Sequence, residues 1–266
     1  MTWIRLFRKR HTEVTLSKAA GLDPRRAQAF NRTTVHNHFL LVDAMLKEIG
    51  AKWKNVYNMD EKGIQVGGGR RSSGRKYKIR SADLELVTVI ECVSADGSSI
   101  PLSFVFSGSS LDVEWLPIAA ERDLHIGLSS NGWTDDYLCK RWFEEHFIPH
   151  ARARADDPND AIVLISDGHG SHVTDELVDC AFNNEIHLYC LPPKTTHKLQ
   201  PLDVGVFRPL QRAWLDRCDD IAEETGMGIP RGAIITEYMG VRDNVFTPAL
   251  IEKAWARTGL NPVNPN

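Results

Sequence analysis

The chain has 266 residues, of which 42% are hydrophobic and 25% charged, and its formal net charge is −3. This length allows one large domain with a substantial core, and the composition is that of an ordinary globular protein. No apolar run is long enough to cross a bilayer, and the first residues lack the apolar stretch of a secretory signal. The five cysteines are scattered without a Cys-x-x-Cys pair, which argues against a zinc site or a disulfide framework and favours a reducing compartment, cytosol or nucleus.

The first 50 residues are expected to be helical, because apolar residues recur at spacings of three and four. The string Gly21-Leu22-Asp23-Pro24 interrupts this pattern, and Asp23 is suited to cap a helix that begins at Pro24. A short strand over residues 55–60 follows and ends in an acid, Asp60. Three glycines at 67–69 then predict a loop or the tip of a hairpin.

A basic run follows these glycines. Residues 70–80 read RRSSGRKYKIR and carry six positive charges and no acid. Because phosphate contacts depend on local charge, this run is a candidate DNA-binding segment in a chain that is acidic overall. The plainer alternative is a solvated surface loop. The six cations are Arg70, Arg71, Arg75, Lys76, Lys78 and Arg80.

The rest of the chain alternates between predicted strands and helices. Residues 86–93 and 100–106 are β-rich runs joined by an Asp-Gly turn, which favours a hairpin. A helix is expected from Thr134, its N-cap, to about Ala155. The pattern indicates an α/β fold with a mixed sheet. The remaining predicted strands cover 161–166 and 186–191, and the remaining helices cover 174–184, 202–221 (kinked or delayed by Pro209) and 248–256.

Two aspartates, Asp60 and Asp167, directly follow predicted buried strands. Ligand sites in α/β sheets gather at the carboxyl ends of strands, so both are candidate site residues. Each also has a structural explanation when taken alone, since an Asp-Gly pair after a strand is often only a turn. A third aspartate, Asp203, stands at a predicted helix start, where an N-cap aspartate is common.

Three sequence blocks give these aspartates a common setting: YNMDEKG from residue 57, LISDGHGSH from residue 164 and LPPKTTHKLQPLDVGVF from residue 191. In this order they closely resemble the catalytic blocks of the pogo, Tigger and jerky group of Tc1/mariner-type transposases, to which centromere protein B is related. The 35 residues between Asp167 and Asp203 fit that group, which uses three aspartates where other DDE transposases end in glutamate. The resemblance covers residues 3–262, and its third block is the most specific because folding alone gives little reason for that string.

The resemblance implies a ribonuclease-H-like fold, a mixed sheet flanked by helices, with an N-terminal helical extension. It also implies a metal-dependent DNA endonuclease and strand-transfer domain in which Asp60, Asp167 and Asp203 hold two Mg²⁺ or Mn²⁺ ions. Asp60, on the central strand, would bridge both ions, with Asp167 on one ion and Asp203 on the other. The partners would be double-stranded transposon ends and target DNA in the nucleus, and chemistry at two DNA ends would suit a homodimer.

The sequence departs from the family pattern at two places. Lys62 stands where the first block usually has threonine, and its positive charge could contact phosphate or compete with a metal. The opening residues resemble only the last part of a helix-turn-helix DNA-binding region. We therefore expect a helical remnant of that region plus a linker over 1–50, a catalytic domain over 51–225 and a C-terminal helical extension over 226–266. Residues beside the aspartates could support the site, although loop-holding roles are simpler: Lys62, His169, His172, His197 and Gln200.

Three functional interpretations stay open at this point. The first is the nuclease domain of a transposase, which the three aspartates favour. The second is a catalytically silent, domesticated DNA-binding nuclear protein of the centromere-protein-B type. The third is another ribonuclease-H-like nuclease that acts on RNA–DNA hybrids or structured DNA. Metal-dependent cleavage of a panel of nucleic acids would distinguish them.

Overall fold

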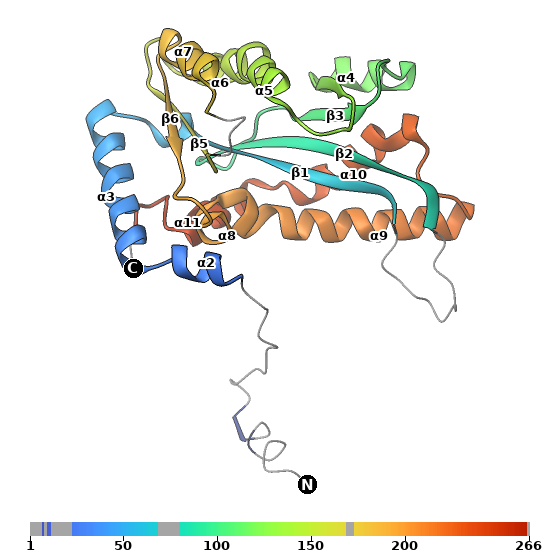
Figure 1. Cartoon of the computed structure of the whole chain (residues 1–266), viewed down its shortest axis with the longest axis horizontal. Helices are drawn as coiled ribbons and strands as arrows, with labels where there is room; N and C mark the ends of the chain where they lie inside the picture. The colour runs from blue at the N-terminus through green and yellow to red at the C-terminus, as the bar shows by residue number, and fades with distance from the viewer. Residues whose placement is uncertain (1–6, 8–9, 12–22, 69–79, 169–172, 265–266) are drawn as a thin grey trace.

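A computed structural model describes residues 7, 10–11, 23–68, 80–168 and 173–264 of the chain. In the described part, six strands form one sheet in the order β4-β3-β2-β1-β5-β6 (Figure 1). Strands β1, β2 and β3 pair antiparallel, whereas β4 is parallel to β3, β5 is parallel to β1, and β6 is parallel to β5. The mixed sheet predicted from the sequence is thereby confirmed. The strands are β1 (Val56–Gly68), β2 (Arg80–Ser94), β3 (Ser103–Ser107), β4 (His125–Ser129), β5 (Ile162–Ser166) and β6 (Ile186–Cys190).

Helices cover both faces of this sheet (Figure 1). One face packs against α5 (Asp136–Trp142), the π-helical turn η3 (Phe143–Phe147), α6 (Ile148–Arg154) and α7 (Asp175–Asn183). The other face carries the larger core cluster, which extends from Phe39 to Leu260 and includes the buried tryptophans Trp115, Trp214 and Trp255. The elements on that side are α3 (Arg32–Ile49), α8 (Thr196–Leu199), the π-helical turn η5 (Leu202–Val206), α9 (Phe207–Thr225), α10 (Ile234–Val245) and α11 (Pro248–Thr258).

Shorter elements connect these layers. Helix α2 (Pro24–Ala29) begins at the predicted residue, and the Asp23 carboxylate caps it by accepting a hydrogen bond from the Arg25 amide at 2.8 Å. Helix α4 (Leu116–Arg122) precedes β4. Three short 3-10 helices cover Trp53–Asn55, Val113–Trp115 and Arg231–Ala233.

Several sequence predictions need correction. Strand β1 does not end at Asp60 but continues to Gly68, because its pairing with β2 runs on from Asp60↔Glu91 to Gly68↔Arg80. The middle helix is capped by Asp135, whose side chain accepts from the Leu138 amide, and not by Thr134. Residues 116–122, 125–129, 196–199 and 234–245 form elements that the sequence patterns did not predict.

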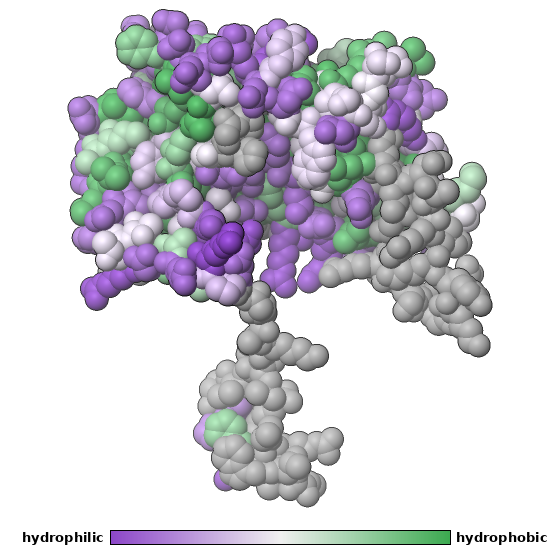
Figure 2. Space-filling model, in the orientation of Figure 1, coloured by the Kyte–Doolittle hydropathy of each residue, from purple (hydrophilic) through white to green (hydrophobic). Residues whose placement is uncertain are grey.

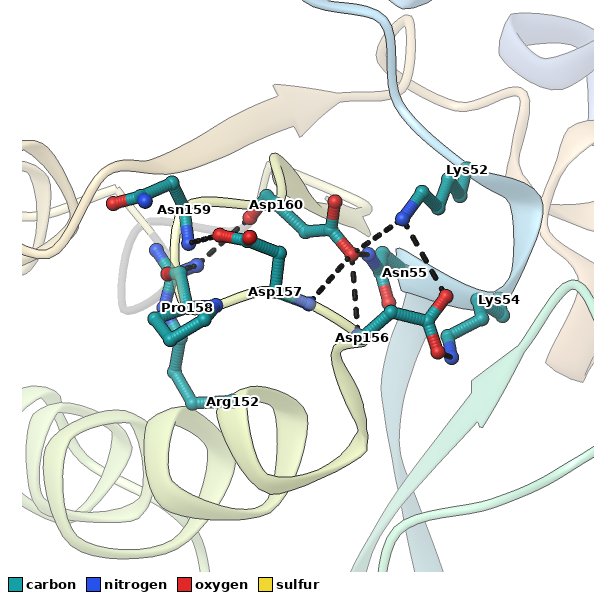
Figure 3. A network of polar contacts seen from close by, with 9 residues as sticks. All are labelled: Lys52, Lys54, Asn55, Arg152, Asp156, Asp157, Pro158, Asn159 and Asp160. Atoms are coloured by element: carbon teal, nitrogen blue, oxygen red, sulfur yellow. Dashed lines mark hydrogen bonds and ion pairs between the residues drawn. The ribbon is translucent and has the colours of Figure 1, made fainter.

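Strands β1 and β5 begin side by side, held by a polar network (Figure 3). The Asp160 carboxylate accepts hydrogen bonds from the Lys52 ammonium at 2.9 Å and from the buried Asn55 amide at 3.4 Å. Lys54 pairs with Asp156 at 2.5 Å in the same network. Single exposed ion pairs contribute little, but several converging on the loop before β5 fix where that strand starts relative to β1. The pairing register at the far ends of the two strands follows from this start.

A buried ion pair joins the sheet to the helical layer below it. The fully buried Glu91 carboxylate, on β2, accepts hydrogen bonds from Arg242 of α10 at 2.8, 2.9 and 3.1 Å. Such a bidentate contact offsets part of the free-energy cost of burying both charges and fixes the orientation of α10 on the sheet.

Candidate active site

Asp60 and Asp167 are brought together by the parallel pairing of β1 and β5. The last paired residues are Asn58 and Ile165, and each aspartate lies two residues beyond its member of that pair. Side chains alternate along a strand, so Asp60 lies on the same face as Asn58. Asn58 pairs with Ile165 of the larger core cluster, so Asp60 faces the layer that contains η5 and α9, and Asp167 lies one residue beyond the end of β5. Both aspartates are half-buried.

The turn after Asp167 depends on glycine. Gly168 has φ +69°, and a Cβ at this position would come within 3.2 Å of the Cys190 Cβ. Gly168 lies two residues beyond the end of β5, and the Leu191 amide, just beyond β6, donates to the Ser166 carbonyl at 2.9 Å. The chain can therefore leave the sheet directly after Asp167 only because residue 168 has no side chain.

Asp203 reaches this region through η5. It is the exposed second residue of that π-helical turn, and not the N-cap of a helix as its position in the sequence would allow. The amide of the preceding residue, Leu202, donates a hydrogen bond to the Asn58 side chain at 3.1 Å. The backbone beside Asp203 is thus attached to the strand that carries Asp60.

Asn58 is the residue that sequence reasoning missed. Its side chain is fully buried, donates to the Ile165 carbonyl at 3.0 Å and accepts from the Leu202 amide, so one amide group connects β1, β5 and η5. A buried polar group must find hydrogen-bond partners, and here those partners are the segments that carry the other two aspartates. The only signal in the sequence was a polar residue inside an otherwise apolar strand.

The strand partner of Asp60 is also an acid, Glu91. Like charges directly across two strands repel, but the Glu91 carboxylate is already bound by Arg242. Glu91 is therefore occupied in a structural ion pair with Arg242, whereas Asp60 lies on the η5 side of the sheet, two residues beyond the last pair between β1 and β5.

Carboxylate oxygens are the donors that Mg²⁺ and Mn²⁺ prefer, so the donor chemistry of Asp60, Asp167 and Asp203 fits a hard divalent cation. The neighbouring Gln200 supplies a further polar group: it is fully buried, and neither polar atom of its side-chain amide has a hydrogen-bond partner among the residues that the structure describes. Within the described residues, however, no three acid, histidine or cysteine side chains are arranged so that they could hold a metal ion. The metal-ligand roles of the three aspartates stay a prediction.

Lys62 follows Asp60 by two residues on β1 and therefore lies on the same face of the sheet. Its ammonium group lies 5.8 Å from the centroid of the Phe207 ring, at the start of α9. The positive charge that distinguishes this chain from the family pattern thus lies between the strand of Asp60 and the helix that continues from η5.

His197 lies near the third aspartate. Burial lowers the pKa of its imidazole, the positive charges of Arg26 and Lys198 lower this pKa further, and the Asp203 carboxylate opposes them. The Phe30 ring packs edge-on against the imidazole, with centroids 6.0 Å apart. The His197 imidazole is therefore near both the Asp203 carboxylate and the cations Arg26 and Lys198.

Several predicted site residues lie outside the described residues. His169 and His172 are two of them, as is the basic run from Arg70 through Arg71, Arg75, Lys76 and Lys78. The backbone of Arg80 is described as the first residue of β2, where it pairs with Gly68 of β1. The basic run therefore connects two antiparallel strands, and its role in DNA binding stays a prediction.

The fold and this strand arrangement define a class, the ribonuclease-H-like catalytic domains. The chain resembles the solved mariner Mos1 paired-end complex with Mg, with a TM-score of 0.54 at 11% identity over 97% of this chain and 70% of that chain. It also resembles the Mos1 transposase catalytic domain solved with Raltegravir and Mn, with a TM-score of 0.51 at 12% identity over 92% of this chain and 98% of that chain. At these identities the likeness shows the fold alone.

Residues 83–224, more than half of the chain, match the model of the DDE superfamily endonuclease family. The chain belongs to this family, and the matched segment contains Asp167 and Asp203. The membership of the DDE group expected from the three sequence blocks is thereby confirmed.

Two curated relatives are similar over longer stretches. A Cochliobolus lunatus protein named MFS-type transporter clz9 is 30% identical over 221 residues, which cover 80% of this chain and 24% of that protein. A mouse protein named Pogo transposable element with KRAB domain is 28% identical over 155 residues, which cover 58% of this chain and 23% of that protein. The chain thus spans about a quarter of the length of these relatives. In the described part of the chain, every helix is too short or too polar to cross a membrane.

Proposed function

We propose that this chain is the metal-dependent DNA endonuclease and strand-transfer domain of a cut-and-paste transposase. The observation that carries the proposal is the register of β1 and β5, which places Asp60 and Asp167 two residues beyond the same strand pair. Leu202, the residue before Asp203, donates a hydrogen bond to Asn58, and this attachment of η5 to β1 supports Asp203 as the third site residue. Family membership supports the endonuclease class.

Asp60, Asp167 and Asp203 would hold two Mg²⁺ or Mn²⁺ ions, with Asp60 shared between them. When bound, such ions activate a water and stabilise the leaving 3′ oxygen of a phosphodiester. The protein's own contribution is to fix the three carboxylates. Asn58 holds the two strands and η5 in place, and Lys62 provides a positive charge on the same face that a DNA phosphate would approach.

The proposed substrate is double-stranded DNA, both at transposon ends and at the target, and the proposed location is the nucleus. The basic run that ends at Arg80 would contact the DNA backbone. We also propose a homodimer, since two transposon ends must be processed together. The division into 1–50, 51–225 and 226–266 belongs to the same proposal, as the helical remnant of a DNA-binding region, the catalytic domain and a C-terminal extension.

The test is cleavage of supercoiled plasmid and of linear duplex DNA by the purified chain with Mg²⁺ or Mn²⁺. We expect nicking or cleavage that EDTA abolishes and that Asp167→Asn lowers by at least about 100-fold, because a carboxylate ligand is lost. Asp179→Asn removes the same charge from an exposed position on α7, on the other face of the sheet, and should cleave like the wild type.

Two outcomes would contradict the proposal. Equal activity of the wild-type chain and Asp167→Asn, with DNA binding retained by both, would favour the domesticated, catalytically silent protein. A preference for RNA–DNA hybrids over duplex DNA would favour a different ribonuclease-H-like nuclease.

A further inference from the structure

A pocket of about 560 Å³ lies between the start of α3, helix α8 and the end of α11. Segments that are far apart in the sequence form it, since its walls come from residues 30–39, 198–199 and 256–264. This volume is in the range of pockets that hold small organic ligands. Its polar lining includes Arg32, His36, Lys198, Arg257 and Asn264.

The charge of this pocket has one sign. Arg32, Lys198 and Arg257 line it, and none of the lining residues that the structure describes is an acid, although the whole chain carries a net charge of −3. All three side chains are exposed, and none forms an ion pair with any residue that the structure describes. Cations that are not neutralised by neighbouring carboxylates and that converge on one hollow create a local positive potential. The pocket is therefore suited to an anion.

An aromatic ring at the rim adds a second kind of contact. Phe30 lines the pocket and is 36% exposed, so an accessible ring stands beside the three cations. The buried Phe39 lies deeper in the same wall. Inorganic anions gain nothing from an aromatic ring, whereas a nucleotide offers both a phosphate and a base that can stack.

The pocket adjoins the candidate active site. Lys198 on its wall and Asp203 are five residues apart in the third sequence block, and α8 leads directly into η5. The Phe30 ring contacts the His197 imidazole, and the charge of the nearby Asp203 carboxylate affects the pKa of that imidazole. Figure 2 shows hydrophilic side chains gathered over α2, next to this region, on the face of the molecule in view. The pocket therefore lies beside the segment that leads to Asp203.

We infer that this pocket binds an unpaired nucleotide of the DNA substrate next to the cleavage site, with the phosphate on Arg32, Lys198 and Arg257 and the base against Phe30. This inference rests on the proposed function in that it takes DNA as the substrate. A duplex is too wide to enter a pocket of this size, whereas one unpaired nucleotide fits. The chain would accordingly favour DNA with a single-stranded overhang over a blunt duplex of the same length.

The test is fluorescence anisotropy with a labelled duplex that carries a single-stranded overhang and with the matching blunt duplex, in EDTA so that nothing is cleaved. The first variant combines Arg32→Gln, Lys198→Gln and Arg257→Gln. We expect weaker binding of the overhang substrate and a salt dependence reduced by about 0.7 logarithmic units per decade of salt, since one single-strand phosphate contact is lost. The matched control combines Arg122→Gln, Lys140→Gln and Arg141→Gln on α4 and α5, which removes the same charge elsewhere and should leave both unchanged.

The second variant, Phe30→Ala, separates stacking from charge. We expect it to weaken binding of the overhang substrate by roughly 5- to 100-fold while leaving the salt dependence as in the wild type. Inorganic phosphate should compete only weakly with the overhang substrate. Thermal melting of each variant would establish that it is folded, and the substituted side chains are at or near the surface.

Three results would overturn the inference. The triple pocket variant could bind like its control, or it could lose affinity equally for overhang and blunt DNA. Inorganic phosphate could displace the overhang substrate fully while Phe30→Ala has no effect, which would make the pocket a simple anion site. Because these measurements need no cleavage, an inactive wild-type chain whose pocket variants still lose overhang binding would contradict the proposed function and leave this inference intact.

Discussion

Asn58 shows how a single side chain can position a site to which it contributes no metal ligand. Its amide has one acceptor and two donor hydrogens, and the structure uses both kinds on backbone groups of β5 and η5. Aspartate has nearly the same shape but lacks the donor, so its carboxylate would face the Ile165 carbonyl. The residue is therefore a positioning residue whose chemistry, and not only its size, matters.

We expect Asn58→Ala to lower the free energy of unfolding by roughly 2–4 kcal/mol, because the Ile165 carbonyl and the Leu202 amide both lose a buried partner. Cleavage activity should fall further than the folded fraction does, since η5 is no longer attached to β1. Urea unfolding and a cleavage assay at low temperature would measure the two effects. Asn244→Ala, at an exposed position on α10, is the control and should change stability by less than about 0.5 kcal/mol. An Asn58→Ala protein as stable and active as this control would contradict the role assigned to Asn58.

At the scale of elements, the π-helical turn η5 depends on close packing against α11. A Cβ on Gly205 would overlap the Cβ of Ala254, so the two backbones approach more closely than side chains would permit. Leu202 and Val206 of the same turn are fully buried in the larger core cluster. The position of Asp203 is therefore determined by what lies beneath the turn as well as by Asn58.

We expect Gly205→Ala to destabilise the protein by roughly 1–3 kcal/mol through overpacking and to lower cleavage by moving η5. Gly240→Ala on α10 is a matched control, because no heavy atom lies within 4 Å of the added methyl group. That control should be neutral or more stable by about 0.5–1 kcal/mol, since alanine favours a helix over glycine. Equal effects of the two substitutions on urea unfolding would argue against tight packing of η5 on α11.

At the scale of the whole molecule, two buried histidines join elements that are distant in the sequence. His38 of α3 lies 2.7 Å from the Tyr189 hydroxyl of β6, and His146 donates through Nε2 to the Pro101 carbonyl at 2.5 Å. Burial lowers the pKa of each imidazole from 6.5 to about 4. Both are therefore neutral in the folded protein at neutral pH.

The lowered pKa values of His38 and His146 predict that the free energy of unfolding falls in mild acid. Below pH 6.5 the unfolded chain binds protons on these histidines that the folded chain does not, until the pH approaches about 4. Their contribution is complete above pH 6.5 and is lost as the pH falls through this window, by up to about 1.4 kcal/mol per pH unit for each histidine. Urea unfolding at pH 7.5, 6, 5 and 4.5 would measure the slope. His146→Gln, which keeps a donor for Pro101, should reduce the slope, whereas His36→Gln at an exposed position should not.

Most of the strands and several of the helices could be predicted because their signals are local. The apolar run of β5 that ends before Asp167, the Asp23 cap and the Asp-Gly turn before β3 all follow from neighbouring residues. The end of β1 could not be predicted, because Asp60 and Lys62 resemble the polar residues that follow a strand. Only the long pairing with β2 extends β1 beyond them. Helix α10 was missed because its apolar stripe is mixed with charged residues, one of which, Arg242, is buried against Glu91.

The sequence by itself determined most of the alternation of strands and helices and the family, because hydrophobic period, turn chemistry and motif spacing are properties of short segments. Tertiary structure alone decided that Asn58 joins β5 to η5, that Gly205 packs on α11 and that Arg32, Lys198 and Arg257 line one pocket. Each of these contacts joins residues dozens to hundreds of positions apart. Whether such residues meet depends on how whole layers pack, and no local pattern carries that information.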